Sequence, residues 1–265
     1  MLKVSNVHKT FNKGTVNEKL ALNGINLELN PGDFVTIIGG NGAGKSTLLN
    51  SICGVFPVDK GSIVIDGVDV TKLPEYKRAK YLGRVFQDPM MGTAADMWIE
   101  ENMSLALRRG KLRGLQWAIT NKERAMYKEM LANLGLGLED RLSSKVGLLS
   151  GGQRQALTLL MAVMQKPKLL LLDEHTAALD PKTAETVLNL SDKFIAEENL
   201  TAMMITHNMK DAIAHGNKLI MMHEGRIIYA ASGEEKKALT VDDLLKKFSD
   251  LSGGALDNDR MLLAN

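Results

Sequence analysis

The sequence has little cysteine, little net charge and no long apolar run, and each absence excludes a class of protein. Its one cysteine, Cys53, excludes an internal disulfide framework and favours a reducing compartment. The formal net charge is only +2, and the basic residues are scattered, so no footprint for nucleic acid is present. No run of about eighteen apolar residues occurs, and Met1–His8 alternates like a strand instead of opening a signal peptide. We therefore expect a soluble chain that meets a membrane only through a partner.

Strand-like and helical patterns alternate along the 265 residues, which predicts an α/β fold with a largely parallel sheet. Strands over 2–9 and 22–29 and a hairpin over 61–70, turning at Asp66-Gly67, predict a β-rich N-terminal portion. Between about 96 and 165 the spacing becomes helical and predicts an inserted helical lobe, with helices over 99–109, 121–134 and 151–165.

The second half returns to alternation and ends in a charged helical segment. The pattern predicts a strand over 169–172, a helix over 181–198, a strand over 202–206, a hairpin turning at Glu224-Gly225 and helical structure over 234–248. Residues 252–265 show no periodic signal, so we expect them to be frayed or to contact a partner.

A glycine-rich segment directly follows the strand-like run Phe34–Ile38 and has the spacing of a phosphate-binding loop. Its residues are Gly39, Gly40, Asn41, Gly42, Ala43, Gly44, Lys45, Ser46 and Thr47. The glycines let the backbone turn sharply and direct N–H groups at phosphate oxygens, and the following helix adds its positive dipole end. Lys45 is expected to bridge the outer phosphates and Ser46 to bind magnesium. The segment predicts a site for ATP or GTP.

Two carboxylates follow the apolar run Leu169–Leu172, at the strand end where sites in parallel sheets usually lie. Asp173 is expected to hold magnesium, directly or through water. Glu174 points elsewhere and is expected to polarise the attacking water as a general base.

A second anion site is predicted in the segment Leu149–Gln155. Ser150 can cap the first helical turn, and Gly151 and Gly152 leave its N–H groups open to an anion. One triphosphate has no obvious need of both sites.

The LSGGQ motif between a phosphate loop and an aspartate-glutamate strand resembles the ATPase subunits of ABC transporters, over about residues 1–231. The resemblance implies a P-loop NTPase core with a RecA-like, mostly parallel sheet, an N-terminal antiparallel β subdomain and an inserted helical subdomain. Residues 232–265 are then a C-terminal helical extension and tail. It also implies a head-to-tail pair of copies, in which the LSGGQ helix of one covers the ATP of the other.

The resemblance assigns further roles by matching motif. Ser150, Gly151, Gly152 and Gln153 would meet the γ-phosphate across the dimer, Gln87 would sense magnesium, His207 would contact the γ-phosphate, and Asp180 would link the two sites. Phe11 lies where the family has an adenine-stacking aromatic, although a core aromatic is the alternative. The chain departs from the family at His175, where a proline is usual.

The methionines and tryptophan after Gln87, Met90, Met91, Met97 and Trp98, match the family's groove for a helix of the membrane subunit, with a role in the lobe's core as the alternative. The chain carries one ATPase unit and resembles importer ATPases, some assigned to aromatic amino acids. The resemblance implies permease subunits, an extracytoplasmic substrate-binding protein and a place at the cytoplasmic face of the membrane. The alternatives are an exporter ATPase and a nucleotide-dependent regulator, and Glu174 argues against the latter.

Overall fold

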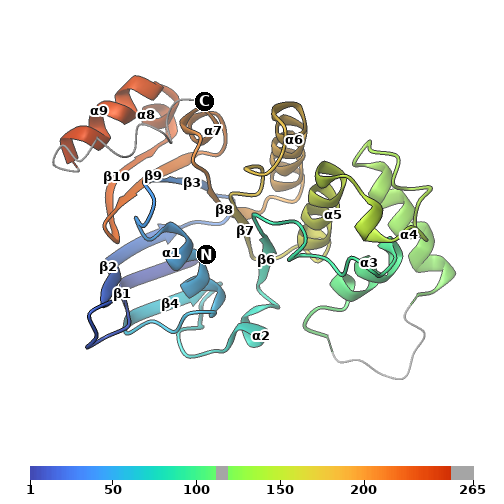
Figure 1. Cartoon of the computed structure of the whole chain (residues 1–265), viewed down its shortest axis with the longest axis horizontal. Coiled ribbons are helices and arrows are strands. Elements are labelled where there is room, and N and C mark those ends of the chain that lie inside the picture. Colours follow the sequence, from blue (N-terminus) through green and yellow to red (C-terminus); the bar gives the residue numbers. More distant parts are fainter. Residues whose placement is uncertain (112–118, 252–265) are drawn as a thin grey trace. The chain divides into compact units, whose positions relative to one another are not determined.

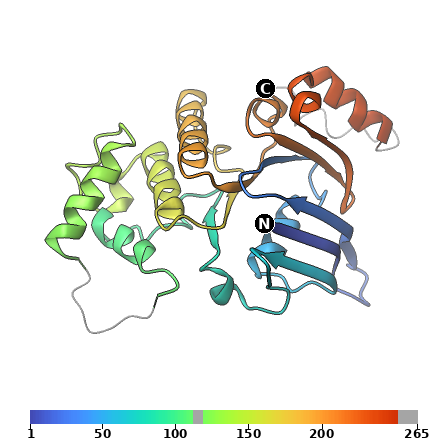
Figure 2. The same ribbon diagram turned by 180° about the vertical axis from the view of Figure 1, so that it is seen from behind.

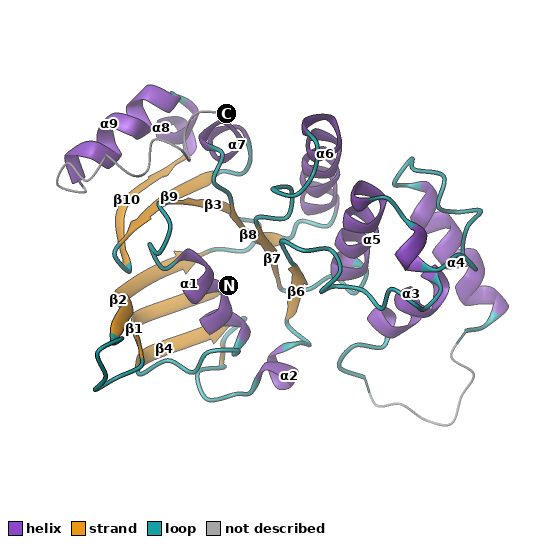
Figure 3. Ribbon diagram, viewed as in Figure 1, coloured by secondary structure: helices purple, strands orange, loops and turns teal. Residues whose placement is uncertain are grey.

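The computed structural model describes residues 1–111 and 119–251, and the chain divides into two compact units. Unit 1 comprises residues 1–78 together with the chain from Asn199 onward, and unit 2 comprises residues 79–198. Unit 1 carries most of the strands, whereas unit 2 is mainly helical (Figure 3). Unit 2 is therefore inserted into the sequence of unit 1. The unassigned segment 252–265, expected to be frayed or to contact a partner, lies outside the described residues.

An antiparallel sheet forms the N-terminal part of unit 1, as predicted. Its strand order is β2-β1-β4-β5, with bounds β1 Leu2–Phe11, β2 Lys19–Leu29, β4 Lys60–Ile65 and β5 Val68–Asp69. All three pairings are antiparallel, and β2, β1 and β4 lie side by side in Figure 1. Asp66 and Gly67 make the predicted turn, both with positive φ (51° and 78°), as the mirror-image hairpin turn requires.

Parallel strands form the second sheet region of unit 1. Strand β3 (Phe34–Ile38) lies between β8 (Thr201–Ile205) and β9 (Lys218–His223) and runs parallel to both. Every residue of β3 and β8 is buried, which explains their continuous apolar sequence. Strand β10 (Arg226–Ser232) pairs antiparallel with β9 through the predicted turn at Glu224-Gly225. Helix α7 (Met209–Ala214) connects β8 to β9, α1 (Lys45–Cys53) follows β3, and α2 (Glu75–Arg78) follows β5.

The C-terminal segment is helical, as predicted over 234–248, and a break divides it. Two helices form, α8 (Gly233–Lys237) and α9 (Val241–Leu251). Thr240 and Asp243 cap α9 reciprocally, because the Asp243 N–H donates to the Thr240 hydroxyl (3.2 Å) and the Thr240 N–H to the Asp243 carboxylate (2.9 Å). Leu244 and Phe248 of α9 are buried in a cluster with Met209 and other apolar residues of unit 1. Packing thus holds α9 against unit 1, and its cap fixes where its first turn begins.

Unit 2 contains a parallel strand pair and most of the larger helices. Strand β6 (Leu82–Val85) runs parallel to β7 (Leu169–Asp173). The helices are α3 (Ile99–Leu107), α4 (Asn121–Ala132), α5 (Gly151–Val163) and α6 (Pro181–Glu197), with a 3-10 turn η1 at Val146–Leu148. Helix α5 lies between α6 and the α3–α4 pair (Figure 2). Helices α3, α4 and α5 each end two residues before the predicted boundary.

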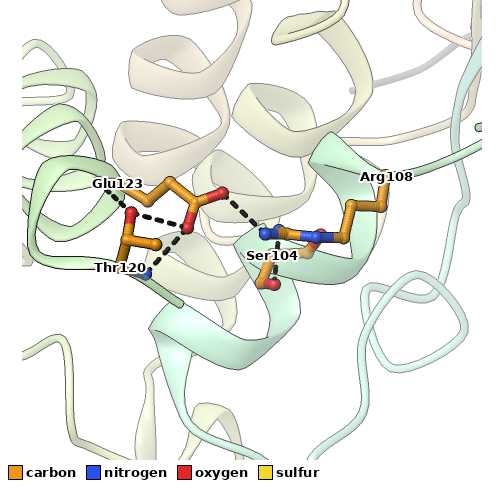
Figure 4. A network of polar contacts seen from close by, with 4 residues as sticks. All are labelled: Ser104, Arg108, Thr120 and Glu123. Carbon is orange, nitrogen blue, oxygen red and sulfur yellow. Dashed lines mark hydrogen bonds and ion pairs between the residues drawn. The ribbon is translucent and has the colours of Figure 1, made fainter. Parts of the chain in front are cut away.

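A polar network joins the end of α3 to the start of α4 (Figure 4). Arg108 donates to the Ser104 hydroxyl (2.7 Å) and to the Glu123 carboxylate (2.6 Å). The other carboxylate oxygen of Glu123 accepts from the Thr120 backbone N–H (2.8 Å) and hydroxyl (2.9 Å), which completes the cap of α4. Burial raises the pKa of Glu123, but the bonds from Thr120 and Arg108 outweigh it and lower the pKa. The network fixes the two helix ends relative to each other within unit 2.

Candidate active site

The phosphate loop of unit 1 connects the buried strand β3 to α1. Gly39, Gly42 and Gly44 have φ of 149°, 78° and 101°, which side-chain-bearing residues rarely adopt. Lys45 is 5% exposed, and its ammonium donates to the carbonyl oxygens of Gly39 (2.7 Å) and Gly40 (3.1 Å). The loop therefore curls around its own lysine, with the N-terminus of α1 opening at the same place.

The loop also presses against neighbouring backbone, which leaves no room for larger residues. A Cβ on Gly39 would lie 2.1 Å from the carbonyl oxygen of Met222, and one on Gly44 would lie 2.5 Å from that of Ala21. The Gly225 N–H donates to the Ala43 carbonyl (2.9 Å) and holds the loop from the β9–β10 turn. A tightly curled backbone with an ammonium and a helix N-terminus suits a polyphosphate, so the residues present fit a nucleoside triphosphate.

His207 and Phe11, also expected at the nucleotide, belong to unit 1 as well. Strands β3 and β8 are parallel, with Ile37 paired to Ile205, so the phosphate loop and His207 follow the same edge of the sheet. His207 is half-buried, two residues beyond β8. Phe11 ends β1, is half-buried, and packs edge to face on Phe56 with ring centroids 5.1 Å apart.

Asp173, the expected magnesium ligand, ends β7 in unit 2 and already has a cationic neighbour. The Arg84 guanidinium on β6 lies 3.2 Å from its carboxylate, and both side chains are 15% exposed. Arg84 also lies over the Phe86 ring at 4.4 Å. Arg84 is not among the site residues predicted from the sequence, although an arginine inside a short apolar strand indicates a carboxylate nearby.

Glu174 follows in an unusual backbone conformation, with φ of 46°. The Ala177 N–H donates to its carbonyl (3.0 Å), and the chain then turns toward α6. Asp180 caps α6 by accepting from the Thr183 N–H (3.1 Å). Hydrogen bonds from the hydroxyl and the backbone N–H of Thr183 lower the pKa of Asp180. The segment from Glu174 to Asp180 is thus a structured turn ending in a helix cap.

The LSGGQ helix α5 begins with the predicted cap. The Ser150 hydroxyl accepts from the Gln153 N–H (3.2 Å), and the Gln153 side chain accepts in return from the Ser150 N–H (3.2 Å). A Cβ on Gly152 would lie 2.1 Å from a methyl of Thr183, so Gly152 is also required by close packing against α6. The packing requirement could not be read from the motif alone.

A cavity of about 390 Å³ lies beside this helix start, within unit 2. Its walls come from Leu136 in the segment after α4, from the LSGGQ segment and from the first two turns of α6. The last two contribute Ser150, Gly152, Gln153, Lys182, Thr183, Thr186 and Val187. Ser150 and Gln153 therefore face an open space, while their cap holds them in place.

Gln155 connects α5 to the strand that precedes Gln87. It is fully buried, and its amide donates to the Phe86 carbonyl (3.1 Å). Gln87 itself is exposed, two residues beyond β6, at the same edge as Asp173 because β6 and β7 are parallel. Gln155 is a second residue that the sequence analysis missed, since its partner lies far away in the chain.

The expected magnesium ligands are divided between the units, with Ser46 in unit 1 and Gln87 and Asp173 in unit 2. Within residues 1–111 and 119–251, no three His, Cys, Asp or Glu side chains gather where they could hold a metal ion. Magnesium usually binds through one or two carboxylates and the phosphates of a nucleotide, so this donor set fits it. In the same residues, no helix is long and apolar enough to cross a membrane.

Comparison with known proteins identifies the family. A family model described as ABC transporter matches residues 22–177. The chain is 44% identical over 248 residues to a tyrosine transport ATP-binding protein of Clostridioides difficile (strain R20291), covering 94% of this chain and 98% of that protein. It is 32% identical to a xylose/arabinose import ATP-binding protein of Sulfolobus acidocaldarius, over 94% and 95% of the two chains.

A solved structure gives the same result for the fold. It is an ATP-binding cassette in a dimeric post-hydrolysis state bound to ADP and Pi, with 31% identity and a TM-score of 0.73, over 88% of this chain and 98% of that one. The predicted resemblance and the P-loop NTPase fold are confirmed. The chain therefore belongs to the ABC transporter family, as an ATP-binding and ATP-hydrolysing subunit.

Proposed function

We propose that two copies of the chain close head to tail around two ATP molecules and drive solute import. The observation that carries this proposal is that each chain has two separate anion-binding backbone segments. One is the phosphate loop of unit 1, and the other is the capped start of α5 in unit 2. A head-to-tail pair brings one segment of each kind to each ATP. The relative of known structure that holds ADP and Pi is a dimer.

ATP is bound mainly by backbone groups of unit 1. The N–H groups of Gly39, Asn41, Gly42, Ala43 and Gly44 surround the phosphates, Lys45 neutralises their charge, and Thr47 extends the contacts at the start of α1. Phe11 stacks on adenine. Ser150, Gly151, Gly152 and Gln153 of the second copy cover the γ-phosphate, and Asp180 communicates between the two sites.

Hydrolysis uses Ser46 at the start of α1 and residues at or just after the ends of the three strands β6, β7 and β8. Ser46, Gln87 and Asp173 would hold Mg²⁺, which would neutralise developing charge on the phosphate oxygens. Glu174 orients the attacking water and accepts its proton as the water oxygen bonds to the γ-phosphorus. The bond from the γ-phosphorus to the β–γ bridging oxygen breaks, and ADP leaves with that oxygen. His207 contacts the γ-phosphate and senses its presence. No group of the chain forms a covalent bond to phosphate in this scheme.

Exposed apolar side chains of unit 2 support a membrane partner. Met90, Met91, Trp98 and Leu148 are 47%, 69%, 43% and 72% exposed, so they do not close the lobe's core. Methionine adapts to irregular surfaces and tryptophan often anchors interfaces. We assign these residues to the contact with a transmembrane permease at the cytoplasmic face. Residues 1–231 form the ATPase domain and 232–265 an extension of it.

The solute is an aromatic amino acid, delivered by an extracytoplasmic substrate-binding protein. This assignment is supported by the tyrosine transport relative, which matches along almost its whole length. Uptake of labelled tyrosine into vesicles that contain the chain and its permease tests the assignment. Tyrosine accumulation that requires ATP and the binding protein supports it, and ATP-driven efflux contradicts it.

The mechanism is tested by ATP hydrolysis and gel filtration of the native chain beside Glu174→Gln. Glu185→Gln, an exposed carboxylate on α6, is the matched control. We expect turnover in the native chain and the control, and in Glu174→Gln loss of turnover with an ATP- and magnesium-dependent shift to dimer. A Glu174→Gln variant that turns over at the native rate would refute the general-base role.

A further inference from the structure

His175 is a buried polar side chain directly after Glu174, at the position where the family usually has proline. It is 2% exposed, and its Nε2 lies 3.0 Å from the hydroxyl of Ser191, which is fully buried. Ser191 belongs to α6, so the contact joins the turn after β7 to the middle of that helix. A buried polar pair of this kind costs free energy to bury unless its hydrogen bond forms.

The direction of this hydrogen bond follows from the second contact of Ser191. The Ser191 hydroxyl donates its one proton to the Val187 carbonyl (2.9 Å), one turn earlier in α6. The same oxygen can then only accept from His175, so Nε2 carries a proton. The bond holds the imidazole ring in one orientation.

The His175–Ser191 hydrogen bond, called the anchor below, lies next to the unusual backbone of Glu174. Glu174 has φ of 46°, the left-handed region that costs a residue with a side chain about 1 kcal/mol. A proline at the next position would favour an extended conformation for the residue before it and would not hold this left-handed one. The hydrogen bond of the His175 side chain to Ser191 ties this turn to α6.

We propose that His175 is a positioning residue: its hydrogen bond to Ser191 ties the turn after β7 to α6 and fixes the direction of the Glu174 carboxylate for hydrolysis. The proposal rests on the proposed role of Glu174 as general base. ATP binding uses other residues, so the anchor acts on the chemical step and not on affinity. A carboxylate displaced by a fraction of an ångström loses rate because the attacking water is no longer aligned.

Four variants separate the anchor from a general effect on folding. His175→Phe keeps a ring without an N–H, and His175→Gln returns an N–H at a similar reach. Ser191→Ala removes one oxygen atom from the partner. Thr158→Val is the matched control, because Thr158 is also buried (2% exposed) and also donates to a carbonyl one turn earlier, that of Arg154 (2.9 Å).

We expect kcat to fall about tenfold in His175→Phe and in Ser191→Ala, with KM for ATP changed less than about twofold. His175→Gln should recover most of the rate, and the double variant His175→Phe/Ser191→Ala should be no slower than either single one. Hydrogen exchange supplies a readout without turnover: the Ala177 amide, bonded to the Glu174 carbonyl, should exchange faster in both knock-outs and not in Thr158→Val.

Three results would overturn the proposal. One is unchanged kcat and unchanged Ala177 exchange in Ser191→Ala, a variant small enough to fold even where His175→Phe does not. Another is an equal loss of kcat in Thr158→Val, which would mean a general loss of stability. The third is native turnover in Glu174→Gln, which would remove the proposed function as well. Loss of turnover in Glu174→Gln with intact Ser191→Ala would remove the anchor alone.

Discussion

Replacing Arg78 by methionine should destabilise unit 1 strongly. Arg78 is 2% exposed, and its guanidinium donates to four backbone carbonyls: those of Leu73 (2.8 Å), Ser51 (2.8 Å), Ile52 (2.9 Å) and Thr71 (3.0 Å). Two of these carbonyls, those of Ser51 and Ile52, lie in the last turn of α1, where the regular helical hydrogen bonds end and where a cation interacts favourably with the helix dipole. The Ser51 carbonyl also accepts from the Gly54 N–H (3.2 Å). Methionine fills much of the same volume but removes the guanidinium from all four carbonyls.

The size of the effect follows from two opposing contributions. Hydrogen bonds from a charged donor contribute about 1.5–3 kcal/mol each, which amounts to about 6–12 kcal/mol for the set. Burial lowers the pKa of Arg78, a sign that taking the cation out of water costs free energy, and this cost is several kcal/mol. We expect a net loss of about 3 kcal/mol. In a domain of this size, that lowers the melting temperature by about 6–12 °C.

Thermal unfolding followed by circular dichroism measures the effect, with Lys77→Met as the exposed control on the same short helix. Arg78→Lys tests the geometry, because one ammonium cannot reach all four carbonyls that the planar guanidinium serves. It should recover less than half of the loss. A melting temperature within about 2 °C of the native value in Arg78→Met would refute the reasoning, since it would mean that water satisfies these carbonyls equally well.

Three further predictions use contacts elsewhere. Arg84→Gln removes the cation beside Asp173, so the Mg²⁺ concentration that half-saturates binding of a non-hydrolysable ATP analogue should fall severalfold; no change would mean that Arg84 does not compete with the metal. The Glu100 carboxylate accepts two hydrogen bonds (2.7 and 3.1 Å) from an arginine of α4. Glu100→Gln weakens them and should lower the free energy of unfolding in urea by about 1–2 kcal/mol, whereas the same change at an exposed glutamate should leave it unchanged. Burial and the Glu235 carboxylate raise the pKa of Tyr229 to about 12. Absorbance titration should therefore show a late tyrosine step that Tyr229→Phe removes. The stability that the phenolic proton supplies is complete below about pH 10 and is lost as the pH rises through about 12.

The sequence predicted those parts of the fold and of the candidate site that local chemistry dictates. The glycines before Lys45 and the strand before them require the observed curl, and Ser150 caps α5 because a hydroxyl there can reach the N–H three residues later. The two hairpin turns were equally local, since both carry a glycine with positive φ in second position. Thr240 and Asp243 have the spacing of a capping pair, which indicates the start of a new helix. The charged helical pattern on both sides of Thr240 made this start hard to recognise.

Contacts between distant parts of the chain could not be predicted in this way. Arg84 and Asp173 are neighbours only because β6 and β7 pair, and Gln155 reaches Phe86 only because α5 packs near β6. The close approach of Thr183 to Gly152 likewise depends on how α5 and α6 cross. These contacts arise from the way helices and strands pack against one another. A single sequence therefore shows the residue type but not the partner that explains it.

The turn between β9 and β10 has an engineering consequence that follows from its hold on the phosphate loop. Hairpin tips on a protein surface normally accept tags, insertions and new chain ends. Here the Gly225 N–H donates a hydrogen bond to the Ala43 carbonyl, and the Gly225 carbonyl accepts one from the Asn23 N–H. The Met222 carbonyl lies close to Gly39. Lengthening this turn would therefore loosen a nucleotide-binding loop encoded some 180 residues earlier in the chain. We expect a rigid insertion in this turn to weaken ATP binding.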